Sequence, residues 1–526
     1  MPRNPIASAA IAAAIALTAV ASSAQARFEP TEATIAGVHA AFRNRTLTCR
    51  SLVQAYLDRI EAYDKRGPAV NSLVVVNPAA LQVADSLDRR FGATGPVGPL
   101  HCVPVIVKDN FETRDLQTTA GSLALRGWVP TRDATMVHKL REAGAIVLAK
   151  SNMAEWAFTP YETVSSILPG YTKNPYALDR VTAGSSGGTA AAIAASLGLV
   201  GLGTDTGNSI RGPSAHTALV GIRSTMGLTS RAGVVPLAFG ADIAGPMART
   251  VADAVEVFNV VVGEDAADSA TLGHGERAEG DYRQHLRRGT LRGARIGVLR
   301  QAYERPTADT EVIAVFTRAL DAMRAQGATI VDPAGVDSLN VLLRGGSCAT
   351  FRYDLERYFR ERGESAPVGT IDGILRSGAY HPTVQLRLQN AQRDTLPPDR
   401  NPACAGVAQA RERFRAAINR MMDTLRLDAV VHPTWSNPPR LIGDLNTPHG
   451  DNSQVFSPRS GFPAITVPMG YTRDDALPAG ITFFGRAWSE ARLISLAYDF
   501  EQTTQHRRAP ASTPPLRNQG RVGRTP

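Results

Sequence analysis

The chain has 526 residues, of which 43% are hydrophobic, 20% charged and 6% aromatic. These fractions are typical of a globular protein and exclude a disordered chain or a fibrous repeat. The net charge is +9, but Lys and Arg form only short clusters such as Arg287-Arg288 and Arg507-Arg508, with no run of five. A nucleic-acid-binding protein concentrates its basic residues on one element, so this class of function is not indicated. Length alone favours two or three domains.

The N-terminal segment 1–26 has the three parts of a secretory signal peptide. Arg3 supplies a positive charge, an apolar run extends from Ile6 to Val20, and Ala24-Gln25-Ala26 is a small-x-small cleavage motif. The run is shorter than the roughly 20 residues that cross a bilayer, although an uncleaved anchor remains an alternative. We therefore expect cleavage near Ala26 and a secreted or periplasmic location, with no stable membrane insertion.

The cysteines and histidines do not form a metal-binding pattern. Cys49, Cys102, Cys348 and Cys404 have no CxxC spacing, and the ten histidines form no HExxH or HxH cluster. The sequence therefore predicts no metal site. In an oxidising compartment the four cysteines allow two disulfides with three connectivities, among which the sequence does not choose.

The first part of the chain, up to residue 150, alternates between helical and extended patterns, which predicts an α/β protein built on a central sheet. Helices are expected over 31–65, 79–91 and 134–143, and strands over 71–77, 99–107 and 145–149. The strand over 99–107 is a nearly continuous apolar run, typical of a buried strand, and it leads directly to Lys108.

Two glycine-rich segments follow, over 183–202 and 203–212. Helical spacing from Thr189 to Leu199 favours a turn that enters a tightly packed helix over a flexible linker. Residues 330–430 are polar and largely helical in pattern, and we expect them to form a cap that shapes a pocket. Strands over 462–468 and 480–485 and a helix over 489–502 complete the body. The Pro/Arg-rich segment 509–526 is expected to be disordered.

The second glycine-rich segment is a candidate site for nucleophilic chemistry. A serine needs a base and a stabilised oxyanion before it becomes a useful nucleophile. Consecutive backbone N–H groups of Thr206, Gly207, Asn208 and Ser209 can converge into an anion-binding nest, with Ser209 at its rim and Gly207 supplying conformational freedom. A turn without a catalytic role is the alternative.

Lys108 and Ser185 each have a structural alternative as well. Lys108 can be a lysine that extends to solvent at the rim of the sheet, and Ser185 can be a helix N-cap. However, a lysine at the end of a buried strand is desolvated, which lowers its pKa toward neutrality and makes it a usable base. Phosphate binding at Ser185 is not indicated, because the segment lacks both the P-loop lysine and the GxGxxG spacing.

Together these segments resemble the amidase signature family. The resemblance spans the whole signature from Ala183 to Ser214, and the spacings between Lys108, Ser185 and Ser209 fit the family's Ser–cis-Ser–Lys triad. It covers most of residues 30–505, with further similarity over 107–110, 150–155, 174–176, 242–250 and 462–468.

The resemblance implies a single α/β domain over 27–508, with a mixed central sheet covered by helices on both faces and a helical cap. It implies a serine amidohydrolase in which Ser209 attacks the carbonyl, Ser185 relays the proton through its position in a cis peptide, and neutral Lys108 accepts it. The backbone of Thr206 to Ser209 would form the oxyanion hole, and no cofactor would be needed.

Two positions depart from the family pattern: Asn208 replaces the glycine that usually precedes the nucleophile, and Cys102 stands where many relatives have glycine. Neither departure removes a catalytic group, so we expect them to affect substrate preference.

Within the family, the signal peptide argues against the cytoplasmic amidotransferase A subunit. The absence of a strongly apolar cap argues against fatty acid amide hydrolases. A secreted peptide amidase is favoured, acting on a peptide or small-molecule amide as a monomer or homodimer. The alternatives are an aryl-acylamide, carbamate or oligoamide hydrolase, and a catalytically inactive periplasmic binding protein.

Overall fold

The computed structural model describes residues 28–344, 348–362 and 366–516. The predicted signal peptide therefore lies outside the described residues. Within these ranges, no helix combines the length and apolar character needed to cross a membrane.

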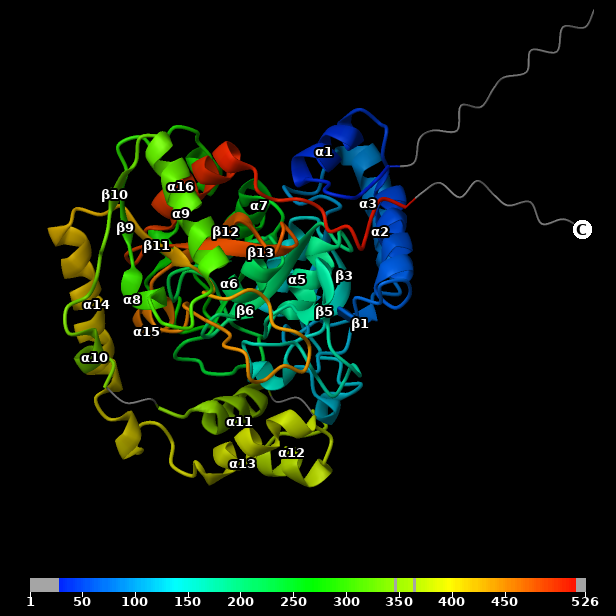
Figure 1. Ribbon diagram of the computed structural model, residues 1–526. Coiled ribbons are helices and arrows are strands. Elements are labelled where there is room, and N and C mark those ends of the chain that lie inside the picture. Colours follow the sequence, from blue (N-terminus) through cyan, green and yellow to red (C-terminus); the bar gives the residue numbers. More distant parts are fainter. Residues whose placement is uncertain (1–27, 345–347, 363–365, 517–526) are drawn as a thin grey trace, which may run out of the picture.

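One mixed sheet of eleven strands runs through the molecule (Figure 1). From one edge to the other its strands are β1 (Leu73–Val76), β3 (Ile146–Ser151), β2 (Pro104–Lys108), β6 (Val200–Asp205), β8 (Ile243–Ala248), β7 (Val220–Arg223), β12 (Ala464–Thr472), β13 (Leu477–Phe484), β11 (Ala429–Pro433), β9 (Arg295–Val298) and β10 (Thr329–Val331). β2 pairs in parallel with both β3 and β6, and β9 in parallel with β10 and β11. The remaining pairs are antiparallel, and a separate hairpin joins β4 (Lys173–Asn174) and β5 (Ala177–Val181).

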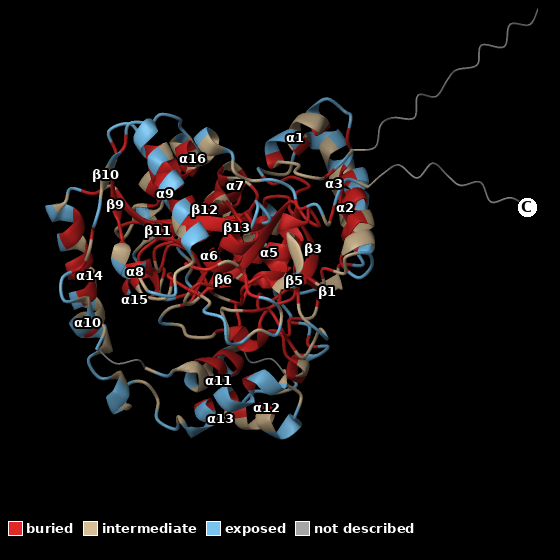
Figure 2. Cartoon of the chain, viewed as in Figure 1, coloured by how far each residue is buried: buried red, intermediate tan, exposed pale blue. Residues whose placement is uncertain are grey.

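Helices flank this sheet, which confirms the predicted single α/β domain with a mixed sheet (Figure 1). Those of the body are α1 (Ile35–Arg43), α2 (Cys49–Tyr63), α3 (Ala80–Thr94), α4 (Thr135–Glu142), α5 (Gly187–Ala194), α6 (Arg211–His216), α7 (Val251–Val261), α8 (Arg300–Tyr303), α9 (Thr310–Ala325), α15 (Phe456–Ser460) and α16 (Glu490–Thr504). Every residue of α5 is buried, and Figure 2 shows the buried residues concentrated around the sheet and its neighbouring helices. A Cβ at Gly188 would lie 2.2 Å from the backbone oxygen of Asn152, which explains why this segment needs small residues.

The region predicted as a helical cap contains α10 (Leu339–Leu342), α11 (Phe351–Arg362), α12 (Ile371–Ser377), α13 (Gln385–Arg393) and α14 (Val407–Thr424). α11, α12 and α13 form a group at the bottom of the view in Figure 1. This group packs on loops of the body through aromatic contacts: Trp128 with Phe359 and Trp156 with Phe351. α14 lies apart from it and packs its Phe414 against Phe456 of α15.

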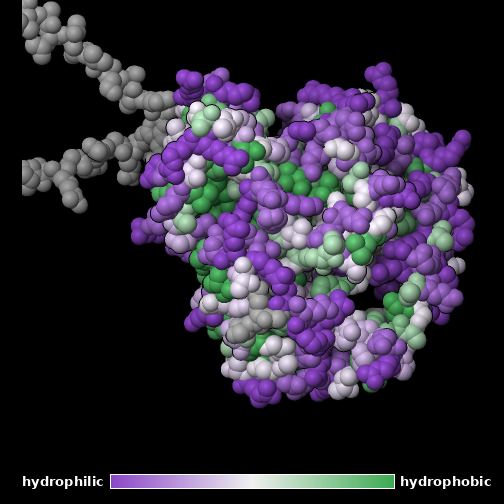
Figure 3. Space-filling view, turned by 180° about the vertical axis from the view of Figure 1, so that it is seen from behind, coloured by the Kyte–Doolittle hydropathy of each residue, from purple (hydrophilic) through white to green (hydrophobic). Residues whose placement is uncertain are grey.

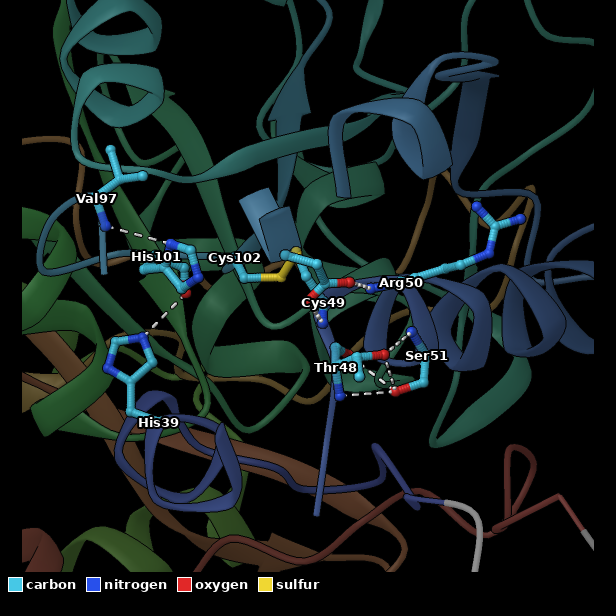
Figure 4. The surroundings of a disulfide bond; sticks show 9 residues. His39, Thr48, Cys49, Arg50, Ser51, Val97, His101 and Cys102 are labelled. Atoms are coloured by element: carbon cyan, nitrogen blue, oxygen red, sulfur yellow. Dashed lines mark hydrogen bonds between the residues drawn. A yellow bond between two sulfur atoms is a disulfide. The ribbon is translucent and has the colours of Figure 1, made fainter. Parts of the chain in front are cut away.

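The four cysteines pair as Cys49–Cys102 and Cys348–Cys404. Figure 4 shows the first disulfide, which joins the start of α2 to the turn before β2, beside the N-terminal capping box of Thr48 and Ser51. β2 begins at Pro104 and not at residue 99, because residues 99–102 form turns. Within these turns Cys102 has φ +63°, a conformation that favours glycine.

Residues 509–516, the described part of the C-terminal segment, contact the body of the molecule. The buried Arg59 guanidinium donates to the backbone oxygens of Thr513 and Pro514, and Ser512 Oγ donates to the oxygen of Pro175. A buried guanidinium needs acceptors, and the backbone of this segment supplies two of them. Residues 517–526 lie outside the described part of the chain.

Candidate active site

Lys108 is the last residue of β2 and its side chain is fully buried. Its Nζ lies 2.8 Å from Ser185 Oγ and 2.7 Å from Thr204 Oγ1, at hydrogen-bond distance from both. Burial lowers the pKa of Lys108 from 10.5 to about 7, against the opposing effect of Asp242 and Asp205. A substantial fraction of Lys108 is therefore neutral at pH 7 and able to accept a proton.

Ser185 lies in the turn that leads into α5, and the Gly184–Ser185 peptide bond is cis. The interpretation of Ser185 as a helix N-cap is wrong. Ser186 occupies that position and its hydroxyl makes no capping hydrogen bond, since it donates to the backbone oxygen of Thr204 at 3.1 Å. The Ser185 hydroxyl is directed to Lys108 instead.

Ser209 lies in the loop between β6 and α6 and is only 5% exposed. The Asp205 carboxylate holds this loop by accepting from the N–H groups of Ile210 and Arg211 and from the Arg211 guanidinium. Burial raises the pKa of Asp205, but Arg211 and Arg223 outweigh burial and lower this pKa to about 2. The carboxylate is therefore ionised over the whole physiological range.

Among the described residues, the backbone N–H groups of Thr206, Gly207, Asn208 and Ser209 have no protein acceptor. They are therefore able to donate to an oxyanion, as the predicted nest requires. Within the described residues, Ser209 Oγ makes no hydrogen bond with Ser185 or Lys108. The structure thus joins Lys108 to Ser185 directly, and it places Ser209 on a neighbouring loop.

A pocket of about 300 Å³ opens over this loop. Its walls come from five parts of the chain: Ala157, Phe158, Pro160 and Tyr161; Thr206 to Ser209; Leu237; Arg387 of the cap; and Gln454 and Pro458. Arg387 donates to the backbone oxygen of Phe158 and lies 5.6 Å from the centroid of its ring. The cap therefore contributes a cation to a pocket that has both apolar and polar walls.

Two residues of the loop differ from what the sequence suggested. Gly207 does not adopt a positive φ, so conformational freedom is not the reason for a glycine here. A Cβ at this position would lie 2.1 Å from Gln454 Oε1, and the glycine therefore leaves room for that amide. Asn208 is fully buried, and its Oδ1 and Nδ2 have no partner among the described residues.

Thr204, Arg387 and Gln454 were missed by the sequence reasoning. Thr204 directly precedes Asp205 in a signature segment, and its place at the end of a strand parallel to β2 could have indicated contact with Lys108. Arg387 and Gln454 belong to segments with no recognisable motif. In the described part of the chain, no group of three or more His, Cys, Asp or Glu side chains is arranged to hold a metal ion.

A buried lysine bonded to one serine, beside a second serine in a loop of free N–H groups, has the components of a serine hydrolase with a lysine base. The family model for amidases matches residues 51–494. The chain therefore belongs to the amidase family, whose members hydrolyse amide C–N bonds.

Individual relatives agree with this family. A probable amidase of Arabidopsis thaliana is 33% identical over 94% of this chain and 95% of its own length. The crystal structure of a peptide amidase from Stenotrophomonas maltophilia is 35% identical, with a TM-score of 0.81 over 91% of this chain and 98% of that one. A bacterial aryl acylamidase is 25% identical, with a TM-score of 0.75 over 90% of this chain and 96% of that one.

Proposed function

We propose that the protein hydrolyses a carboxamide through an acyl-enzyme on Ser209, with Ser185 and Lys108 as the proton path. The observation that carries this proposal is the contact between Ser185 Oγ and a buried lysine whose pKa is about 7. The Ser209 hydroxyl oxygen adds to the carbonyl carbon while its proton passes to Ser185, and the Ser185 proton passes to Lys108 Nζ. The backbone N–H groups of Thr206 to Ser209 donate to the oxyanion.

The second half of the reaction reverses this proton path. Protonated Lys108 returns its proton through Ser185 to the leaving nitrogen as the C–N bond breaks. Water then adds to the acyl carbon, losing a proton along the same path, and the C–O bond to Ser209 breaks to release a carboxylic acid. Every proton taken up by Lys108 is returned within one turnover.

For the substrate, we propose a peptide that carries a C-terminal amide. The similarity to the Stenotrophomonas maltophilia peptide amidase over almost the whole of both chains supports this choice. Hydrolysis of an aryl-acylamide is the second candidate, supported by the likeness to the aryl acylamidase. Carbamates and oligoamides are further alternatives. A catalytically inactive binding protein is disfavoured, because Lys108, Ser185 and Ser209 are all present.

We propose a secreted or periplasmic location, with cleavage near Ala26. Two observations support it: the signal-peptide pattern of segment 1–26, and the pairing of all four cysteines in disulfides, which persist in oxidising compartments. N-terminal sequencing of protein from a periplasmic extract should give a first residue near Arg27. An intact Met1 on the exported protein would contradict cleavage.

Ammonia release from peptide amides tests the proposed reaction, with anilides, fatty amides and carbamates as competing substrates. Ser209→Ala should abolish turnover, by a factor above about 1,000. Ser214→Ala is the matched control, because Ser214 is a buried serine of α6 whose hydroxyl has no partner among the described residues. Turnover that survives in Ser209→Ala, with the fold intact by circular dichroism, would refute the assignment of the nucleophile.

A further inference from the structure

Gln454 places an amide in the pocket beside the loop that carries Ser209. It lies shortly after Asp451, in the segment that leads into α15. Its Nε2 donates to Asp451 Oδ2 at 2.7 Å and lies 3.3 Å from the position that a Cβ would take at Gly207, farther than the oxygen of the same amide. The oxygen Oε1 is the atom that lies against Gly207, within 2.1 Å of the position a Cβ would take there.

Asp451 fixes this orientation of the amide. It is 8% exposed and its Oδ1 accepts from the backbone N–H of Ser453 at 2.9 Å. Burial raises the pKa of Asp451 to about 6, so this carboxyl is mostly ionised at pH 7 and acts as an acceptor only. An ionised carboxylate holds the donor end of the Gln454 amide and repels its oxygen, which keeps Oε1 turned toward Gly207.

Gln454 lines the pocket, and its Oε1 accepts no hydrogen bond from the described residues. The backbone N–H groups of Thr206 to Ser209, which line the same pocket, are donors only. An acceptor in such a place complements an N–H of the substrate and not its carbonyl oxygen.

We propose that Gln454 Oε1 accepts a hydrogen bond from an N–H group flanking the scissile carbonyl, so that Gln454 selects acylamino or carboxamide substrates over analogues that lack this N–H. Asp451 is a positioning residue that acts through Gln454. This inference rests on the proposed function, since it names the substrate group that the same site recognises. The N–H belongs either to the leaving nitrogen or to the nitrogen on the acyl side of the carbonyl.

Three substrates separate these two sources of the N–H. N-acetylphenylalaninamide carries both N–H groups. 3-Phenylpropanamide lacks the acyl-side N–H, and the methyl ester of N-acetylphenylalanine lacks the leaving-group N–H. The purified mature enzyme is assayed on all three, followed by Gln454→Met, which keeps the length of the side chain and removes the acceptor.

Loss of one neutral hydrogen bond should lower kcat/KM about fivefold to tenfold. If Gln454 Oε1 accepts from the acyl-side N–H, kcat/KM falls for N-acetylphenylalaninamide and for the methyl ester and stays unchanged for 3-phenylpropanamide. If Oε1 accepts from the leaving-group N–H, kcat/KM falls for the two amides and stays unchanged for the ester. Either split supports the proposal, whereas an equal loss on all three substrates, or no loss, overturns it.

Two further variants separate hydrogen bonding from a change of pocket shape. Leu237→Met alters the wall of the same pocket without changing an acceptor, so any effect should fall on all three substrates alike. Asp451→Asn should give the same split as Gln454→Met, and the double variant should lose little more than either single variant, since both act on one hydrogen bond. Additive losses in the double variant would overturn the positioning role of Asp451.

A wild-type enzyme that hydrolyses none of the three substrates would contradict the proposed function itself, and this inference would fall with it.

Figure 3 shows the surface hollowed between the body and the cap, with hydrophobic residues at the edge of the hollow.

Discussion

Replacing Lys108 by methionine should make the protein more stable and inactive at the same time. Burial lowers the pKa of Lys108 from 10.5 to about 7, and this difference of about 3.5 between the two pKa values is equivalent to about 5 kcal/mol. Below pH 7 folding must bury the charged ammonium, which costs this full amount. Methionine avoids that cost and loses two hydrogen bonds of about 1 kcal/mol each, so we expect a net gain of about 3 kcal/mol at pH 6.

The pH dependence of this gain in stability distinguishes the removal of a buried charge from an improvement in packing. Between pH 7 and 10.5 the unfolded lysine still binds a proton that the folded one has released, so wild-type stability rises with pH by about 1.4 kcal/mol per pH unit relative to the variant. The advantage of Lys108→Met should therefore shrink above pH 7 and almost disappear near pH 9.

Urea unfolding followed by tryptophan fluorescence at pH 6, 7, 8 and 9 measures this difference. Ser214→Ala serves as the control, because its side chain does not titrate and its difference from wild type should stay constant over the series. A Lys108→Met variant that is less stable than wild type by the same amount at every pH would refute the assignment of a neutral lysine.

Three other predictions follow from the site and the cap. The kcat/KM of the wild type should fall about tenfold per pH unit below the Lys108 pKa of about 7 and level off above it, and a flat profile with rate-limiting chemistry would exclude a neutral lysine base. Gly207→Ala should lower kcat/KM at least tenfold with little loss of melting temperature, because its Cβ would collide with Gln454 Oε1; full activity would show that the amide can move aside. Replacing both Cys348 and Cys404 by serine removes the disulfide that joins the two ends of the segment containing Arg387. Because Arg387 lines the pocket, KM should rise more than kcat falls. Unchanged kinetics would show that the cap does not need this disulfide.

Much of the architecture was predictable because it depends on local patterns. Apolar runs identified the buried strands, including the one that ends at Lys108, and small residues at helical spacing identified α5. The contact between Lys108 and Ser185 was implied only by the resemblance to the family, since 77 residues separate them along the chain. No local pattern measures such a distance.

The parts that sequence reasoning missed depend on contacts between distant segments. Gly207 was interpreted through the backbone freedom of glycine, but its reason lies in Gln454, which comes much later in the chain. The C-terminal segment looked disordered from its composition, although Arg59 holds residues 513 and 514. In both cases one side chain decides the local structure of a segment far away in the sequence.

Arg59 also has a consequence for the topology of the chain. The Glu29 carboxylate lies 3.6 Å from Arg59 Nη1, and the same nitrogen donates to the oxygen of Pro514 at 2.9 Å, so the beginning and the end of the described body meet at one guanidinium. A short linker could join these two ends, and the chain could then be opened at an exposed loop such as the one around Asn446 without crossing the core. The order of the segments along the polypeptide is thus separable from the fold. Attachment of the enzyme to a support through this corner would also leave the cap, at the opposite end of the molecule in Figure 1, facing the solution.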